Sequence, residues 1–237
     1  MSNPIAGLLN SCRKFVQTRV AQSCLLCGAR SKAGLLCPHC ADDLPRLPAQ
    51  CCPSCALPTP GGQVCGACLR KPPAFDRTEA LFRYEFPVDA LIQRLKYGGQ
   101  TAIAADLAQR LALHVPAADR PDLIVAMPLH SRRLRERGFN QAALLAGHLA
   151  QHLGIEFAPS ACRRERDTPP QVALPVKERR KNIRGAFVCD ADLSRRRVAL
   201  VDDVMTTGAS LDELARVVRR AGAVEVSAWV VARAIKD

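Results

Sequence analysis

Two adjacent carboxylates, Asp202 and Asp203, stand between an apolar run and a loop of small residues in the stretch VALVDDVMTTGAS. Neighbouring carboxylates repel each other unless a cation or hydroxyl groups lie between them, so this pair favours a sugar diol, a magnesium ion or both. The loop favours a phosphate, because small residues let backbone N–H groups close around an anion. A sugar phosphate that carries a metal-bound diphosphate meets both requirements. The loop residues are Thr206, Thr207, Gly208, Ala209 and Ser210.

The elements around this stretch are expected to hold it at one edge of a parallel sheet. Four apolar residues, 198–201, suit a strand covered on both faces, and the carboxyl end of such a strand is where open α/β sheets place their ligands. Apolar residues then recur at helical spacing over 211–221, and Gly222 suits the end of that helix. The loop would therefore lead into a helix N-terminus, whose dipole favours a phosphate. An isolated acid pair could simply close a strand, but the complete order favours a ligand site.

Eight of the twelve cysteines form a repeat in the first third of the chain. Each half consists of C-x2-C, a spacer and C-x2-C, and the second half, from Cys52, repeats the spacing of the first, from Cys24. Two such turns supply the four thiolates of a tetrahedral site, so each half is typical of a zinc ribbon with one structural Zn²⁺. A disulfide framework is the alternative, but the start of the chain lacks the order of a secretory signal, and thiols stay reduced inside cells. We expect sequential pairing, although an interleaved cross-brace would use the same residues: Cys24, Cys27, Cys37, Cys40, Cys52, Cys55, Cys65 and Cys68.

Three segments are expected from the order of these patterns. Residues 1–23 have apolar positions at helical spacing and predict an amphipathic helix. Residues 24–70 would form the double zinc ribbon, whose halves are too short to bury a core and would take their folding energy from the metal. Residues 71–237 would form an α/β domain, a parallel sheet flanked by helices. Its predicted strands cover 78–84, 123–127 and 198–201, and its predicted helices begin near 88, 103 and 142.

Two basic stretches would bring positive charge to the edge that holds Asp202. The first, PLHSRRLRERGFNQ, follows the buried strand at 123–127, and we expect it to be a loop that binds diphosphate through Leu129, His130 and Arg137. A solvated basic loop is the alternative. The second stretch, 163–187, contains prolines that exclude a continuous helix and is interpreted as a lid over the site or as an arm that grips nucleic acid. Its candidate flap residues are Arg166, Gln171 and Arg179.

The composition indicates a partner rich in phosphate. The net charge of +12 attracts a diphosphate or a polynucleotide equally well, so charge alone does not choose between them. Aromatic residues make up only 4% of the chain, which argues against a broad stacking platform for single strands. No apolar run approaches the length that a membrane helix needs, so we expect a cytoplasmic protein without an integral membrane segment.

The motifs together resemble two known groups of proteins. VDDVMTTGAS resembles the phosphoribosyl diphosphate (PRPP) signature of the type I phosphoribosyltransferases, with Met205 as one departure inside the approach to the loop. With LKYGG and PLHSRRLRERGFNQ, the chain resembles the ComF family over nearly its whole length. The flap positions that share this resemblance are Arg166, Thr168, Gln171, Arg179, Asn182, Gly185, Ala186 and Phe187.

The resemblance implies a site for PRPP and Mg²⁺ and a link to natural competence, the uptake of single-stranded DNA. As a phosphoribosyltransferase, the chain would hold the ribose with Asp202 and Asp203, the 5′-phosphate with residues 206–210 and the diphosphate with residues 129–137. Catalysis would then consist mostly of positioning and electrostatics, because no side chain stands out as a nucleophile. The alternative is a non-catalytic component of the DNA-uptake machinery that binds single-stranded DNA and other competence proteins. The acceptor stays open, because a fold resemblance does not carry base specificity.

Overall fold

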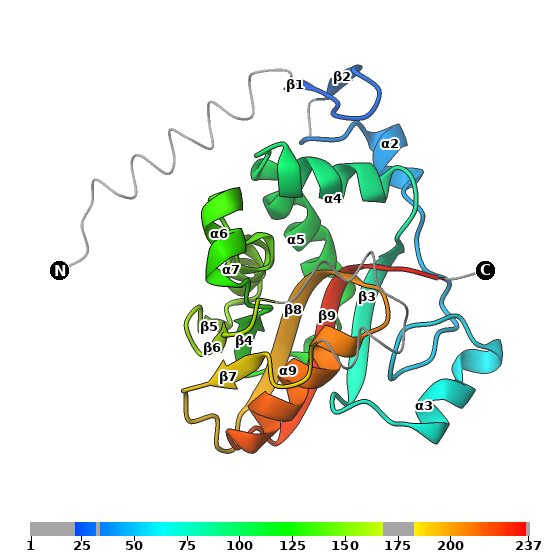
Figure 1. The fold of residues 1–237 in the computed structure, drawn as a ribbon. Helices are drawn as coiled ribbons and strands as arrows, with labels where there is room; N and C mark the ends of the chain where they lie inside the picture. Colours follow the sequence, from blue (N-terminus) through cyan, green and yellow to red (C-terminus); the bar gives the residue numbers. More distant parts are fainter. Residues whose placement is uncertain (1–21, 32–33, 168–182, 236–237) are drawn as a thin grey trace. The chain divides into compact units, whose positions relative to one another are not determined.

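The computed structural model describes residues 22–31, 34–167 and 183–235 (Figure 1). The chain divides into two compact units, residues 1–44 and residues 45–237. The helix predicted over residues 1–23 lies outside the described residues except for its last two positions, which form a short strand. No helix in the described ranges is long and apolar enough to cross a bilayer.

The first unit holds one cysteine half-repeat on very little secondary structure. Strands β1 (Gln22–Ser23) and β2 (Arg30–Ser31) pair in antiparallel fashion, and helix α2 (Pro38–Asp42) follows. Proline at the first helical position suits the start of α2, because its missing N–H would have no partner there. A unit of this size buries few apolar side chains, so its order depends on the four cysteines.

The second unit begins with the other half-repeat and continues into a five-stranded parallel sheet. The half-repeat contains the 3-10 turn η1 (Pro60–Gly62) and helix α3 (Gly66–Arg70). The sheet has the order β3-β9-β8-β4-β5, and every neighbouring pair in it is parallel. Its strands are β3 (Arg77–Arg83), β4 (Leu123–Ala126), β5 (Glu156–Phe157), β8 (Arg197–Met205) and β9 (Glu225–Arg233).

Helices cover both faces of this sheet, which confirms the predicted fold class. Figure 1 shows α9 in front of the sheet and α5 and α7 behind it. This placement follows from right-handed crossovers, because β8 leads to β9 in one direction and β4 leads to β5 in the other. The helices of this unit are α4 (Val88–Tyr97), α5 (Ala102–His114), the 3-10 turn η2 (Ala117–Asp119), α6 (Ser131–Arg137), α7 (Gln141–Leu153) and α9 (Ala209–Arg220).

Strand β8 is longer than the apolar run predicted. It continues from Val201 through Asp202 and Asp203 to Met205, because β9 supplies hydrogen-bonded partners along this whole length. On its other side the pairing with β4 ends at Ala126, opposite Val201. The acid pair therefore lies inside β8, at the carboxyl edge of the sheet, where one neighbouring strand has already ended.

The basic stretch after β4 is also different from the predicted loop. Residues 131–137 form the short helix α6. His130 precedes it, and its side chain accepts a hydrogen bond from the backbone N–H of Arg132. Gly138 ends it with φ of 83°, a left-handed conformation that glycine adopts without steric cost. The second basic stretch starts and ends in a two-stranded antiparallel ribbon made of β6 (Cys162–Arg164) and β7 (Phe187–Cys189).

Candidate functional site

A cavity of about 250 Å³ opens at the carboxyl edge of the sheet, and it brings the predicted acid pair and the predicted phosphate loop together. The acid pair comes from β8, the loop joins β8 to α9, and further side chains come from α4, α6, α7 and β6. Seventeen residues line the cavity: Tyr84, Lys96, Met127, Pro128, Leu129, Arg133, Gln141, Arg164, Asp202, Asp203, Val204, Met205, Thr206, Gly208, Ala209, Ser210 and Leu211.

The two carboxylates of the acid pair have different surroundings. Asp203 is buried, forms an ion pair with the Nζ of Lys96 on α4 and accepts a hydrogen bond from the Nε2 of Gln141 at 3.4 Å. Asp202 is only half-buried, and its Oδ1 accepts from the backbone N–H of Asp203 at 2.8 Å. Successive side chains of a strand point to opposite faces, which separates the two environments. Asp203 is therefore held by protein groups, whereas within the described residues Asp202 forms no ion pair.

The pKa values of Asp202 and Asp203 shift in opposite directions, because their surroundings differ. Burial raises the pKa of Asp202, and the neighbouring charge of Asp203 raises it further. Burial also acts to raise the pKa of Asp203, but the charge of Lys96 outweighs it and leaves that pKa below its usual value. For Lys96, burial acts to lower the pKa, and the charge of Asp203 reverses the effect and raises it. Asp202 is thus the carboxyl group that a bound cation or hydroxyl group would stabilise most.

The phosphate loop leads into the N-terminus of α9, where the N-cap residue has no side chain. Gly208 is the N-cap of α9, has φ of 75° and makes no side-chain capping bond. Backbone N–H groups in the first turn of a helix have no partner within the helix, so they can bind an anion at this end of the cavity. Met205, the departure from the phosphoribosyltransferase pattern, is buried and lies 3.7 Å from where a Cβ on Gly208 would be. Met205 therefore packs against the loop at Gly208.

Two cationic side chains also line the cavity. Arg133 comes from α6, and Arg164 comes from β6 with its guanidinium 5.7 Å from the ring centroid of Phe187. Burial lowers the pKa of Arg164 and the charge of Arg133 lowers it further, while Asp167 and Asp202 act in the opposite direction. Two arginines and the carboxylate of Asp202 line the same cavity. Together they suit a ligand that carries both negative charge and hydroxyl groups.

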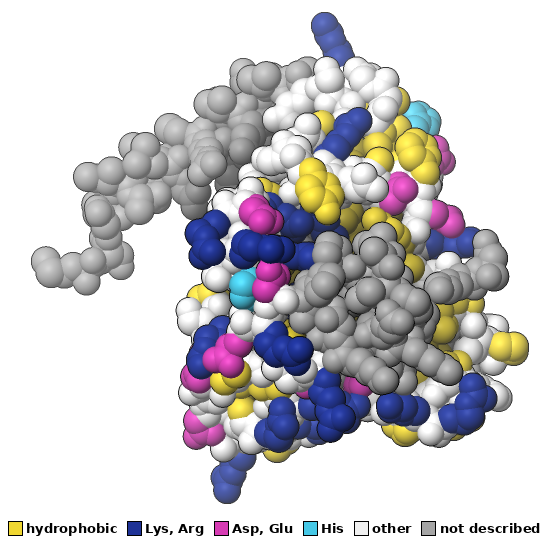
Figure 2. Space-filling model, in the orientation of Figure 1, with side chains coloured by type: hydrophobic (Ala, Val, Ile, Leu, Met, Phe, Trp, Pro, Cys, Tyr) yellow, Lys and Arg dark blue, Asp and Glu magenta, His cyan; other side chains and the backbone are white. Residues whose placement is uncertain are grey.

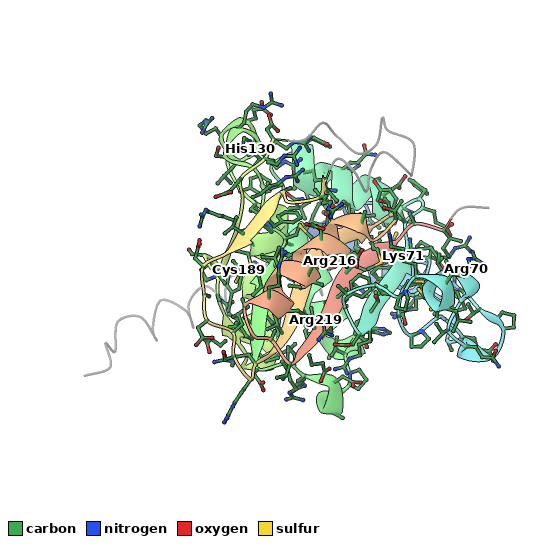
Figure 3. The ribbon with its side chains drawn as sticks, turned by 60° about the horizontal axis from the view of Figure 1, so that its bottom comes forward. Arg70, Lys71, His130, Cys189, Arg216 and Arg219 are labelled. Carbon is green, nitrogen blue, oxygen red and sulfur yellow. The ribbon has the colours of Figure 1, made fainter. Side chains whose placement is uncertain are left out.

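Several predicted residues lie outside this cavity. His130 caps α6 and lies 3.7 Å from Asp167, at the start of the helix in Figure 3. Arg137 lies 5.3 Å from the ring centroid of Tyr97 and donates to the Oε1 of Gln141, so it reaches Asp203 only through that glutamine.

Thr207 and the flap residues are also away from the cavity lining. The Oγ1 of Thr207 accepts from the N–H of Ala209 at 3.4 Å, and the residue lines a smaller neighbouring cavity. Arg166 donates to the carbonyl oxygen of Arg184 at 2.8 Å, across the base of the second basic stretch. Gln171 and Arg179 lie outside the described residues.

The most important residue that the sequence analysis missed is Lys96. It follows Val88 and Ile92 at regular i, i+4 spacing, so it continues the buried face of α4, and a lysine on such a face is a signal that could have been used. Arg133 and Arg164 belong to the two basic stretches that were predicted to bring positive charge to this edge, whereas Gln141 gave no comparable signal. All three reach the cavity through the order of the strands, which brings α6, α7 and β6 to the same edge.

The eight repeat cysteines form two separate groups of four, which is the sequential pairing. Within each group the Sγ atoms all lie within 4.8 Å of one another. The Sγ atoms of Cys27 and Cys37 are 3.7 Å apart, and those of Cys55 and Cys65 are also 3.7 Å apart. Four sulfurs at about 2.3 Å from a tetrahedral Zn²⁺ would be separated by about 3.8 Å. Both groups therefore have the geometry of structural zinc sites.

Comparisons with known proteins agree with these features. A double zinc ribbon domain model matches residues 16–69. The DNA utilization protein YhgH of Escherichia coli O157:H7 is 37% identical over 191 residues, which cover 78% of this chain and 84% of that protein. Competence protein F of Haemophilus influenzae is 35% identical over 220 residues, 89% of this chain and 90% of that protein. A purine phosphoribosyltransferase structure from Pyrococcus horikoshii aligns with 56% of this chain and 84% of its own, at 21% identity and a TM-score of 0.35. The chain belongs to the ComF family, and the double zinc ribbon lies in its N-terminal part.

Proposed function

We propose that this protein binds PRPP with Mg²⁺ at the carboxyl edge of the sheet and transfers its phosphoribosyl group to a nitrogenous acceptor. The observation that carries the proposal is that the two carboxylates of the acid pair have different surroundings. Lys96 neutralises Asp203, while Asp202 keeps a raised pKa in a cavity that also contains the N-terminus of α9. A ligand with a phosphate at one end and a diol at the other fits both features.

Each part of the cavity then has one task. The backbone of residues 206–210 holds the 5′-phosphate at the N-terminus of α9. Asp202 accepts hydrogen bonds from the ribose hydroxyl groups. Asp203 contacts Lys96 and Gln141 and so holds the end of β8, with Asp202, in a fixed position. Arg133 and Arg164 stabilise the negative charge that develops on the departing diphosphate. Mg²⁺ would bind with the diphosphate and neutralise part of its charge, near the oxygens of the acid pair.

Calorimetric titration with PRPP and Mg²⁺ tests the binding step. The Asp202→Asn/Asp203→Asn variant removes the carboxylate charge that accepts two hydrogen bonds from the ribose hydroxyl groups, each worth about 1.5–3 kcal/mol, so its affinity should fall by about 100-fold or more. The chain offers a matched control in another adjacent pair, Asp42 and Asp43, which is exposed on α2 and its end. The Asp42→Asn/Asp43→Asn variant changes the net charge equally and should bind as the wild type does. Equal affinity in all three proteins, or no binding by the wild type, would overturn the proposal.

Turnover is tested separately by diphosphate release. We expect release from PRPP that depends on Mg²⁺ and on a nitrogenous acceptor, with candidate free bases and single-stranded oligonucleotides compared at equal concentration. The names of the relatives, competence protein F and DNA utilization protein, support a place for the reaction in the handling of incoming DNA. Tight PRPP binding with no release for any acceptor would instead favour a protein that senses PRPP.

A second candidate function, binding of single-stranded DNA, is favoured by a cationic cavity beside the site. This cavity of about 460 Å³ lies between α4 and α6, and the exposed ring of Tyr97 lies there under the guanidinium of Arg137. An aromatic ring and arginines together suit a base and its phosphate. The lining residues are Lys96, Tyr97, Gly99, Arg132, Arg133, Glu136, Arg137 and Phe139.

Other positive side chains of the second unit are less suited to this role. Lys and Arg side chains gather along the lower edge of the face in Figure 2, where Figure 1 places α9. Figure 3 shows Arg216 and Arg219 along α9, but Arg216 is paired with Asp212 at 2.8 Å and Arg219 with Asp76 at 2.5 Å. Arginines already paired with carboxylates have less charge to offer a DNA backbone. Arg132 in the cavity between α4 and α6 is also paired, with Asp167 at 2.9 Å, so that cavity is distinguished by the exposed ring of Tyr97 next to Arg137.

The DNA candidate is tested by the salt dependence of oligonucleotide binding. We expect the logarithm of the affinity to fall linearly with the logarithm of the salt concentration, and Tyr97→Ala to weaken binding by about 1–3 kcal/mol at every salt concentration. Leu113→Ala is a suitable control, because Leu113 on α5 is another large apolar side chain that is mostly exposed. Binding that ignores salt, or that both variants weaken alike, would contradict this candidate.

A further inference from the structure

One buried arginine, Arg233 at the end of β9, contacts both the second zinc ribbon and the phosphate loop. Its Nε donates to the carbonyl oxygen of Cys55 at 2.7 Å. Its Nη1 donates to the carbonyl oxygens of Met205, at 3.0 Å, and of Thr206. The same Nη1 lies 2.6 Å from the carbonyl oxygen of Ala234, and only 4% of the residue is exposed. A single guanidinium therefore joins a cysteine turn to the first residue of the loop.

The surroundings of Arg233 are unusual for a buried charge. All four acceptors are backbone carbonyl oxygens, and within the described residues no carboxylate forms an ion pair with it. A buried cation normally needs a compensating negative charge. Four thiolates around one Zn²⁺ carry a net negative charge, so the second zinc site would supply that charge beside Arg233. The favourable position of the arginine thus depends on an intact zinc site.

The cysteine turn that Arg233 contacts is itself fixed to the sheet. The N–H of Thr78 on β3 donates to the carbonyl oxygen of Pro53 at 2.9 Å, and its Oγ1 donates to that of Ser54 at 2.7 Å. Together with Arg233, these contacts use three consecutive carbonyl groups of the turn between Cys52 and Cys55. The turn presents a rigid surface to the sheet edge when its cysteines are held by metal.

The loop is supported by the segment that leaves the ribbon as well. The ring of Phe75 is buried and lies 3.8 Å from where a Cβ on Gly208 would be. The N–H of Ala74 donates to the Oδ1 of Asp212, in the first turn of α9, at 2.7 Å. The phosphate loop therefore contacts groups fixed by the second ribbon both through Arg233 and through this segment.

We propose that Arg233 is a positioning residue that fixes the phosphate loop to the second zinc ribbon, so that zinc bound by Cys52, Cys55, Cys65 and Cys68 sets the affinity of the loop for phosphate. The consequence for ligand affinity rests on the proposed function; the mechanical link between zinc and loop does not. The ribbon then has a role in ligand binding without touching the ligand.

Arg233→Lys tests the link with the charge retained. One ammonium group cannot reach the carbonyl oxygens of both Cys55 and Thr206, so the loop should lose its fixed position. We expect hydrogen exchange of the amides at 204–211 to rise about tenfold without ligand, PRPP affinity to fall about tenfold, and zinc content to stay unchanged. Arg83→Lys is the control, because Arg83 is opposite Arg233 on β3 and is partly exposed in an ion pair with Glu85.

The pattern of exchange separates positioning from general stability. A merely structural role would raise exchange in β9 and in the part of β8 before residue 204 as much as in the loop, whereas the proposal confines the rise to residues 204–211. Exchange in the loop that stays at the wild-type rate in folded Arg233→Lys would overturn the proposal. A wild type that binds no PRPP, with the loop still loosened in the variant, would overturn only the proposed function.

Loss of zinc, by substitution of a cysteine or by chelation, tests the same link with Arg233 in place. Cys65→Ser and Cys37→Ser occupy equivalent places in the two half-repeats, since each is the third cysteine of its half, and each removes one ligand from one site. Cys65→Ser, or chelation of the second zinc in the wild type, should loosen residues 204–211, whereas Cys37→Ser should leave them unchanged. Equal loosening by both substitutions, or a loop that keeps its protection after the second zinc is lost, would overturn the proposal.

Discussion

The two zinc ribbons have nearly the same local structure and different connections to the rest of the chain. In the first ribbon the N–H of Cys24 donates to Ala29 and that of Gly28 to Cys24. At the equivalent places of the second ribbon the N–H of Cys52 donates to Leu57 and that of Ala56 to Cys52. Helices α2 and α3 also each begin directly after the third cysteine of their half-repeat. The repeat in the sequence is thus a repeat of backbone hydrogen bonds.

The difference lies in what the cysteine turns contact. The first ribbon forms its own compact unit, residues 1–44, whereas the second belongs to the unit of the sheet. In the second, the carbonyl groups of Pro53, Ser54 and Cys55 accept hydrogen bonds from Thr78 and Arg233. One metal motif can therefore serve as an independent module or as part of an α/β domain, and its spacing alone does not tell which.

The largest expected effect comes from breaking one zinc site at a time. Cys65→Ser should lower the free energy of unfolding of the sheet unit by several kcal/mol, because metal binding to such a site contributes about 10–16 kcal/mol and supports contacts to β3 and β9. Cys37→Ser should leave that unfolding transition unchanged. Urea titration followed by fluorescence measures this directly, since Trp229, the single tryptophan, is buried in β9. Equal midpoints for both variants would remove the distinction between the ribbons.

The order of zinc release should follow the exposure of the cysteines. We expect two zinc ions per chain, measured by elemental analysis in reducing buffer. A chelator should take the first ion about tenfold faster, because Cys27 is exposed whereas all four cysteines of the second group are at least partly buried. Two ions released at one rate would show that the two ribbons open together, and a content of one ion would leave one group without metal.

Asp202→Asn should stabilise the sheet unit whether or not the first ribbon is intact. Its folded pKa is raised by burial and by Asp203, so stability is present at low pH and is lost as the pH rises through that folded pKa. The variant should be more stable than the wild type by roughly 1 kcal/mol at neutral pH, and the gain should vanish below about pH 4. Thermal unfolding across pH, in the wild type and in Cys37→Ser, should give the same gain in both.

Asp203→Asn provides the opposite case within the same pair. The pKa of Asp203 is lowered because Lys96 outweighs the effect of burial, and the substitution would leave that lysine buried without its partner. It should therefore lower the free energy of unfolding near neutral pH. Two substitutions that shift stability in the same direction would mean that the carboxylates share one environment.

The smallest effect is expected at the residue that follows each first C-x2-C turn. Gly28 and Ala56 occupy equivalent positions with φ of 75° and 56°, a region where a side chain costs about 1 kcal/mol. Gly28→Ala should weaken zinc binding by the first ribbon about fivefold, since the open space around Gly28 offers no compensating contact. A competition titration with a zinc indicator measures the change, and an equal loss at the second site would contradict the assignment to one ribbon.

The parts of the structure that could be predicted from sequence depend on local patterns. The cysteine spacing predicted the two groups of four, and apolar periodicity predicted the main strands and helices, including the buried face of α4. The extension of β8 past Val201 was not predictable in this way, because it depends on pairing with β9. The helical form of α6 was missed although His130 and Gly138 frame it, because dense arginine was interpreted as a loop.

The connections that define the site are the least visible in sequence. Lys96 and Asp203 are far apart in the chain and meet only because α4 and β8 share an edge of the sheet. Arg233 is the last residue of a strand that is otherwise mostly apolar, and nothing nearby in the sequence indicates a contact with Cys55. Such long-range contacts follow from the strand order, which local spacing does not determine.

The structure of the protein bound to PRPP and Mg²⁺ would show whether the ligand lies at the carboxyl edge of the sheet. We predict that the 5′-phosphate lies against the backbone of residues 206–210 at the N-terminus of α9, with the ribose hydroxyl groups within about 3 Å of the Asp202 carboxylate. The diphosphate should point toward Arg133 and Arg164, and the ion pair between Lys96 and Asp203 should remain. A phosphate bound among the arginines of the cavity between α4 and α6, with the loop at residues 206–210 empty, would contradict the account.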